Sequence, residues 1–150
     1  MATPYNSSTA SPIRVERTKA NLPQSAAAPI FTVSGGKVLI SDIIGEVETT
    51  AIEAGANNMK LISNPTVGAD VDLCAVLDIA ADAIGTTYHI TGTLTDALVA
   101  KTSGAGESQA TPIEVSAGTI DLSCDASKTG KIKWTLFYIP IDSGAKVVKV

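Results

Sequence analysis

The sequence contains few of the residues that enzymes use for chemistry. Its 150 residues include one histidine, two cysteines and six aromatic residues. A single histidine, His89, leaves little material for proton transfer, and no G-x-S-x-G motif marks a catalytic serine. We therefore expect no enzymatic activity and no cofactor.

Long hydrophobic runs are also missing. No apolar run approaches the roughly 18 residues that span a bilayer, and the first residues lack the basic-then-apolar order of a secretory signal. We expect a protein that is made in the cytoplasm and has no membrane partner.

Two cysteines, Cys74 and Cys124, are too few for a structural zinc site, which takes four ligands. In a chain without an export signal both thiols are expected to be reduced. The alternation within residues 69–79 places the side chain of Cys74 on the opposite face of the strand from Leu73 and Leu77. A disulfide with Cys124 is therefore possible only if this assignment of faces is shifted by one residue.

The net charge of −4 is unevenly distributed. Arg14, Arg17 and Lys19 against Glu16 give the first 30 residues a charge of +2, which leaves −6 for the remainder. Nucleic-acid binding draws most of its affinity from cations that neutralise phosphates. An acidic body therefore excludes direct nucleic-acid binding as the expected function.

Short strands joined by turns dominate the rest of the pattern. Hydrophobic residues make up 45% of the chain, mostly Ala, Val, Ile and Leu, and apolar residues recur with a period of two. Residues 47–58 fit a helix and a strand with a loop equally well. The pattern predicts an all-β fold, a single β-sandwich or β-barrel domain. Strands are predicted within residues 37–44, 57–65, 69–79, 86–99, 111–124 (as two runs around Ala117-Gly118) and 130–142.

Strand phase also predicts the core and the wet faces. Leu94 and Val71 are assigned to inner faces, and His89, which lies among threonines, to an outer face exposed to solvent. "TSGAGES" (102–108) is interpreted as a hairpin tip, because the P-loop pattern needs a lysine that does not follow. The side chains expected to form the core are Trp134, Tyr138, Leu136, Tyr88 and Leu73.

Four prolines, Pro4, Pro12, Pro23 and Pro29, exclude a helix from the N-terminal part of the chain. In isolation, the burial of its few apolar residues does not compensate for the conformational entropy lost when the segment is ordered. We expect an extended arm over residues 1–29 and a sandwich or barrel body over 30–150, with the arm lying on a neighbouring subunit. The residues expected to bind this partner are Ile13, Arg14, Val15, Arg17, Lys19 and Leu22.

Acidic side chains at Asp70, Asp72, Asp78 and Asp82 offer oxygens to a hard cation, but they lack the spacing, glycine and closing glutamate of an EF-hand. Charges on the solvent face of a strand explain Asp72 and Asp78 more simply. We expect no metal site.

The chain resembles small virion proteins of tailed bacteriophages, in particular head decoration or capsid cement proteins, across residues 33–147. The resemblance lies in "VSGGKVLISDIIGEVETTAIEAGANNMKLISNPTVGADVDLCAVLDI" and "GTIDLSCDASKTGKIKWTLFYIPIDSGAKV". It implies a β-rich structural protein on the capsid exterior, often a homotrimer, bound where major capsid protein subunits meet. It does not extend to the arm.

Two alternatives remain open at this point. A tail, fibre or adhesin-type protein that contacts a cell-surface glycan requires several exposed aromatic residues at one end of the domain. A small hydrolase requires His89 close to an aspartate and a serine.

Overall fold

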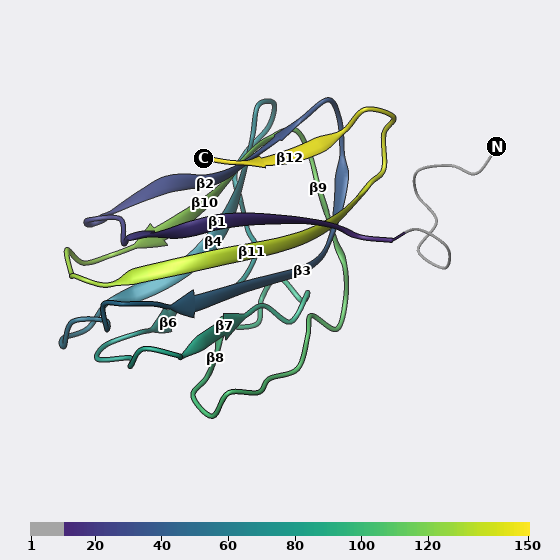
Figure 1. Cartoon of the computed structure of the whole chain (residues 1–150). Coiled ribbons are helices and arrows are strands. Elements are labelled where there is room, and N and C mark those ends of the chain that lie inside the picture. Colours follow the sequence, from purple (N-terminus) through teal and green to yellow (C-terminus); the bar gives the residue numbers. More distant parts are fainter. Residues whose placement is uncertain (1–10) are drawn as a thin grey trace.

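Two antiparallel sheets pack face to face in the computed structural model of this chain, which describes residues 11–150 (Figure 1). The fold is therefore all-β, a β-sandwich, as the sequence predicted. The described part of the chain holds no helix with the length and hydropathy to cross a membrane.

Sheet A forms one layer and sheet B the other. The strands of sheet A are, in spatial order, β1 (Ile13–Asn21), β11 (Lys131–Pro140), β3 (Val38–Val47), β7 (Thr87–His89) and β8 (Val99–Lys101), with β9 (Ile113–Val115) also paired to β3. The strands of sheet B are β12 (Lys146–Lys149), β2 (Ala26–Ser34), β10 (Gly118–Cys124), β4 (Asn58–Pro65) and β5 (Val71–Asp72), with β6 (Leu77–Asp78) also paired to β4.

The core lies between the sheets and is centred on Trp134, which is fully buried. Its ring stacks on that of Tyr88, with centroids 6.5 Å apart. Gly45 lies opposite Trp134 in the register of β3 and β11, and a Cβ there would come within 2.8 Å of the ring. The glycine therefore makes room for the indole. The five predicted core residues are all buried, which confirms the strand phase at Trp134, Tyr138, Leu136, Tyr88 and Leu73.

Residues 47–58 form no helix. Val47 is the last residue of β3, opposite Ile132 of β11, and residues 48–57 form a loop. The backbone N–H of Glu48 donates to the carbonyl of Lys131, and Thr49 has a positive φ of 62°. Strand pairing continues into the segment and a turn follows at once, so a helix cannot start there.

The single strand predicted for residues 69–79 is instead two short strands, β5 and β6. Between them the chain turns to the other sheet, where Ala75 forms a parallel bridge with Ala97. Leu73 and Ile79 are buried as predicted, but Val71 is 45% exposed. In the next segment β7 ends at His89, and Leu94, expected inside, is 40% exposed.

The boundary expected at residue 29 is wrong. β1 pairs with β11 from Ile13 to Asn21, and β2 begins at Ala26 and pairs with β10. Figure 1 shows β1 lying alongside β11 within sheet A. The strands supplied by the rest of the chain compensate for the ordering entropy that the segment cannot offset alone. Residues 1–10 of the expected arm lie outside the described residues.

Candidate functional site

Most residues predicted to bind a partner lie on β1, the edge strand of sheet A. Ile13, Arg14 and Lys19 are exposed, while Val15 and Arg17 are half-buried. The half-buried positions face inward, because Val15 lies opposite Leu136 of β11 and Arg17 opposite Trp134. The structure therefore brings five of the six predicted residues together on one sheet edge.

Leu22 is the exception, since it lies in the hydrophobic core and is 3% exposed. Its backbone N–H donates to the carbonyl of Gly130, and its side chain approaches that glycine beside Ile52. The chain turns inward after β1 because this leucine fills space between the sheets. Leu22 supports the fold and is not available to a partner.

β1 lies next to β12, the edge strand of sheet B. The Nε of Arg17 donates to the carbonyl of Val150 at 3.1 Å, which links the two sheets on this side. Within the described residues β1 pairs with β11 alone and β12 with β2 alone, so each leaves one backbone edge unpaired. We call β1 and β12, with Val150, the basic edge. Its cations are Arg14, Arg17, Lys19, Lys146 and Lys149, against one anion, Glu16.

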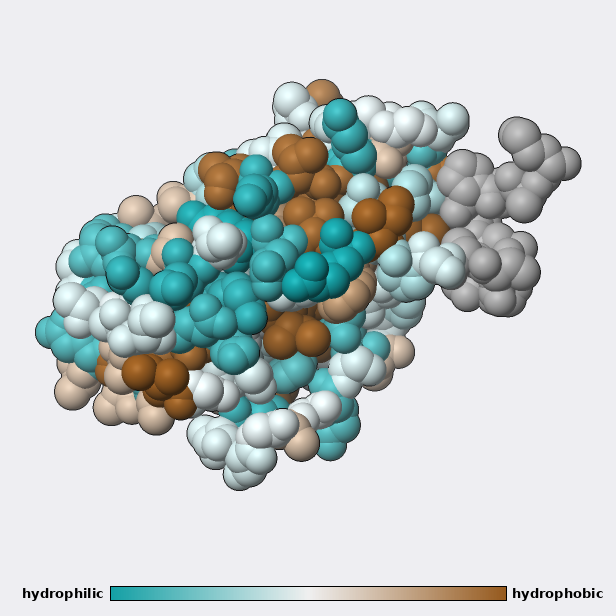
Figure 2. All heavy atoms as spheres, in the orientation of Figure 1, coloured by the Kyte–Doolittle hydropathy of each residue, from teal (hydrophilic) through white to brown (hydrophobic). Residues whose placement is uncertain are grey.

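The basic edge also carries exposed hydrophobic side chains. Ile13 is 45% exposed, Val148 44% and Val150 55%. Figure 2 shows hydrophobic surface over β12 and the neighbouring part of β1, interspersed with hydrophilic surface. Exposed unpaired strands with hydrophobic side chains are typical of surfaces that bind another protein.

The opposite side of the sandwich has the opposite charge. Here the sheets meet through the bridge between Ala75 and Ala97. We call residues 67–78 and 92–98 the acidic edge. The sequence has no lysine or arginine from residue 61 to residue 100. The anions of this edge are Asp70, Asp72, Asp78 and Asp96.

The acidic edge too is partly hydrophobic. Val67 is 88% exposed, Val76 48%, Val71 45% and Leu94 40%. Val71 and Leu94 line a recess of about 130 Å³, which Glu114 also borders. The recess is small and mainly apolar, so it suits an inserted side chain better than a substrate.

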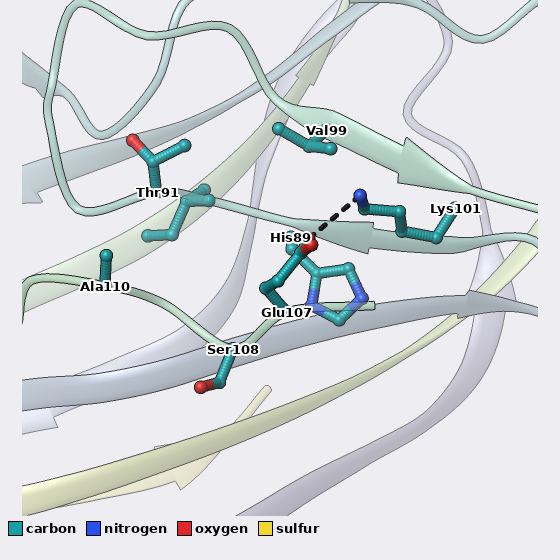
Figure 3. Close-up of a pocket in the computed structure, with 8 residues that line it drawn as sticks. His89, Thr91, Val99, Lys101, Glu107, Ser108 and Ala110 are labelled. Carbon is teal, nitrogen blue, oxygen red and sulfur yellow. Dashed lines mark ion pairs between the residues drawn. The ribbon is translucent and has the colours of Figure 1, made fainter. Parts of the chain in front are cut away.

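A second recess, of about 150 Å³, lies on the outer face of sheet A beside His89 (Figure 3). His89 faces outward as predicted. It pairs with Ile44 of β3 and Val99 of β8, and the three side chains project from the outer face of sheet A. It is nevertheless only 8% exposed, so the expected solvent exposure is wrong. The loop 102–112 folds over the ring, and a Cβ at Gly106 would lie 3.1 Å from its Nε2.

Polar contacts hold this loop on the sheet. Lys101 and Glu107 form an ion pair at 2.9 Å next to His89, as Figure 3 shows. The side-chain amide of Gln109 donates to the carbonyls of Ile40 and Thr111 at 3.0 and 2.8 Å. The segment predicted as a hairpin tip is therefore a cover over the sheet.

The environment of His89 favours its neutral form. Burial lowers its pKa, and the charge of Lys101 acts in the same direction, while Asp42 and Glu107 oppose the shift. Nε2 lies 3.2 Å from the hydroxyl of Thr87, and the buried Nδ1 has no hydrogen-bond partner in the described structure. The ring is thus positioned by packing.

This environment predicts a pH dependence of stability. Below pH 6.5 the unfolded chain takes up a proton at His89 that the folded chain does not, so the free energy of unfolding should fall as pH drops from 6.5 to the lowered pKa. Denaturant titrations at several pH values measure this slope, which should be positive and smaller than that of one full proton. The variant His89→Gln should lose the slope in this range; an unchanged slope would contradict the assignment.

Both cysteines are buried and free. The Sγ of Cys74 accepts a hydrogen bond from the backbone N–H of Leu61, and burial raises the pKa of both thiols, that of Cys124 to about 12. Each is therefore a protonated core residue. Among residues 11–150, no cluster of three or more His, Cys, Asp or Glu side chains is arranged to hold a metal ion.

Comparison with protein-family models, curated proteins and solved structures found no match to this chain.

Two surfaces of the sandwich, β12 and the acidic edge, are not among the residues predicted to bind a partner. The alternation in "KVVK" at residues 146–149 is a signal for the former, since it places one valine inside and the other outside. The run of 40 residues without a cation is a signal for the latter. Only the strand order of the two sheets shows that β12 and the acidic edge lie on opposite sides of the sandwich.

Proposed function

We propose that this protein is a structural virion protein of a tailed bacteriophage, a cement or decoration protein that binds the outer surface of the assembled capsid. Support comes from the resemblance over residues 33–147 and from the β-rich domain that it implies. The observation that carries the proposal is that exposed hydrophobic side chains are concentrated on two edges of the sandwich. Of the eight large hydrophobic side chains exposed in the described residues, seven lie on the basic and acidic edges.

Cementing requires affinity for the assembled lattice and no catalytic step. A protein that binds assembled shells but not free subunits stabilises the shell by mass action. The major capsid protein is the proposed partner, and the chain reaches the capsid exterior after synthesis in the host cytoplasm. The acidic net charge fits a role outside the shell, away from the packaged nucleic acid.

A binding assay tests the proposal directly. Heads of the phage that encodes this chain are purified without it, mixed with increasing amounts of the full chain, sedimented and heated. The chain is expected to sediment with the heads up to a fixed stoichiometry and to raise the temperature at which they break open. Sedimentation with tails instead of heads, or with neither, would contradict the proposal.

The alternative of a glycan-binding tail or adhesin protein has less support. In the described part of the chain the aromatic rings of Phe31, Tyr88, Trp134 and Tyr138 are buried and Phe137 is half-buried. Sugar recognition by stacking needs rings on the surface. Four of these five described rings belong to the hydrophobic core.

A further inference from the structure

We propose that copies of this chain associate head to tail, the basic edge of one copy docking on the acidic edge of the next. The partner is thus a second copy of the same chain. This inference does not depend on the capsid function, because it concerns the isolated protein.

The topology places the two edges on opposite sides of one rigid sandwich. β1 and β12 end their sheets on one side, where Arg17 and Val150 join them. β8 and β5 end the same sheets on the other side, where Ala75 bridges to Ala97. A contact between unlike edges therefore leaves one edge of each kind free for the next copy.

The charges of the two edges are complementary. Five cations and one anion give the basic edge +4, and four aspartates give the acidic edge −4, although Asp72 forms an ion pair at 2.8 Å with Lys60 of the neighbouring β4. Like edges repel each other, which disfavours two-fold pairing. Electrostatic complementarity of this kind selects the partner and the register of a contact.

Hydrophobic side chains provide the affinity that exposed charges do not. Each edge presents them beside its charged groups, three on the basic edge and four on the acidic edge. The recess between Val71 and Leu94 offers a small apolar site for a side chain such as Val148 or Ile13. The free backbone edge of β1 or β12 can add hydrogen bonds across the contact.

A contact between two different patches generates a closed ring when the rotation between copies closes, and a filament when it does not. The contact proposed here is of this kind. A two-fold dimer is not, since it uses the same patch twice.

Paired charge reversals test the contact in the full chain. Lys146→Glu with Lys149→Glu lowers the charge of the basic edge from +4 to zero, and Asp70→Lys with Asp72→Lys raises that of the acidic edge from −4 to zero. All four positions are exposed, so each variant should fold. The acidic-edge variant also loses the surface ion pair of Asp72 with Lys60, which is worth up to about 1 kcal/mol.

Lys128→Glu, in the loop between β10 and β11, is the control, because Lys128 belongs to neither edge. Its half-buried side chain lies 4.0 Å from Glu53, so the melting of this variant is checked like that of the others.

Light scattering after gel filtration and sedimentation equilibrium give the mass. The unmodified chain should show a multiple of the 15.3 kDa subunit mass, and added salt should weaken the association. Each reversal should raise the dissociation constant about tenfold or more, because it removes the net charge of one edge and with it the attraction between unlike edges. Lys128→Glu should leave the mass unchanged.

Mixing the two reversed variants gives the decisive result. The basic-edge variant keeps an acidic edge of −4 beside a neutral edge, and the acidic-edge variant keeps a basic edge of +4 beside a neutral edge. The mixture should therefore form a 1:1 dimer through the two unmodified edges, although neither variant associates alone. Three results would overturn the proposal: a monomer at every concentration, an oligomer that neither reversal weakens, or a mixture that stays monomeric. A monomer whose basic-edge reversal abolishes binding to heads would make the capsid protein the occupant instead.

Discussion

Removal of residues 1–29 is expected to abolish cooperative folding. The deletion takes away all of β1 and the first four residues of β2. It uncovers the edge of β11, whose inward residues include Trp134 and Leu136, and it removes Leu22 from the core. A domain is stable by a small margin, so the loss of a strand and a core leucine exceeds what it can tolerate.

Circular dichroism and a urea titration measure the result. The full chain should show one sharp transition, whereas the shortened chain should show none or should be insoluble. Removal of residues 1–10 is the control, because every contact described above is made by residues that follow them. A sharp transition in the chain that lacks residues 1–29 would mean that β1 is a detachable arm.

Trp134→Ala should lower the free energy of unfolding by about 3 to 5 kcal/mol. The indole is fully buried, packs over Gly45 and stacks on Tyr88. Its removal leaves a cavity between the sheets that the strands on either side cannot close. For a domain of this size the melting temperature should fall by about 10 °C, as measured by calorimetry.

Trp134→Phe is the matched variant for this position. Phenylalanine keeps an aromatic ring against Tyr88 and removes the buried Nε1–H, which has no hydrogen-bond partner in the described structure. Its loss of stability should be clearly smaller than that of the alanine variant. Equal losses, or a loss near zero for alanine, would show that the indole is not the centre of the core.

Local patterns predicted the strands that lie in the middle of the sheets. Along β11 the burial of Ile132, Trp134, Leu136 and Tyr138 follows the alternation of the sequence, because a strand with neighbours on both sides has one face on the core. The same holds for β4, and largely for β10. The segment 69–79 alternates equally well but forms two short edge strands, since alternation does not reveal where pairing stops.

Residue properties led to the hypothesis that residues of β1 bind a partner, which stays a prediction, but they did not reveal that β1 is a strand of the sandwich. Arg14 and Lys19 are exposed as expected, while Leu22 is buried. The hydrophobic residues of the segment 1–29 are too few to indicate by themselves that it belongs to the sandwich. β11 supplies a ladder of hydrogen bonds and a hydrophobic face that the segment lacks alone.

The sequence by itself determined the all-β class, the composition of the core, the outward phase of His89 and the opposite signs of charge along the chain. Tertiary structure decided that the loop 102–112 buries His89, that β1 belongs to the sandwich, and that cationic and anionic segments lie on opposite edges. The reason is physical: hydrophobicity and strand phase act between neighbours in the chain. Burial of an outward residue and the position of an edge depend on contacts between segments far apart in sequence.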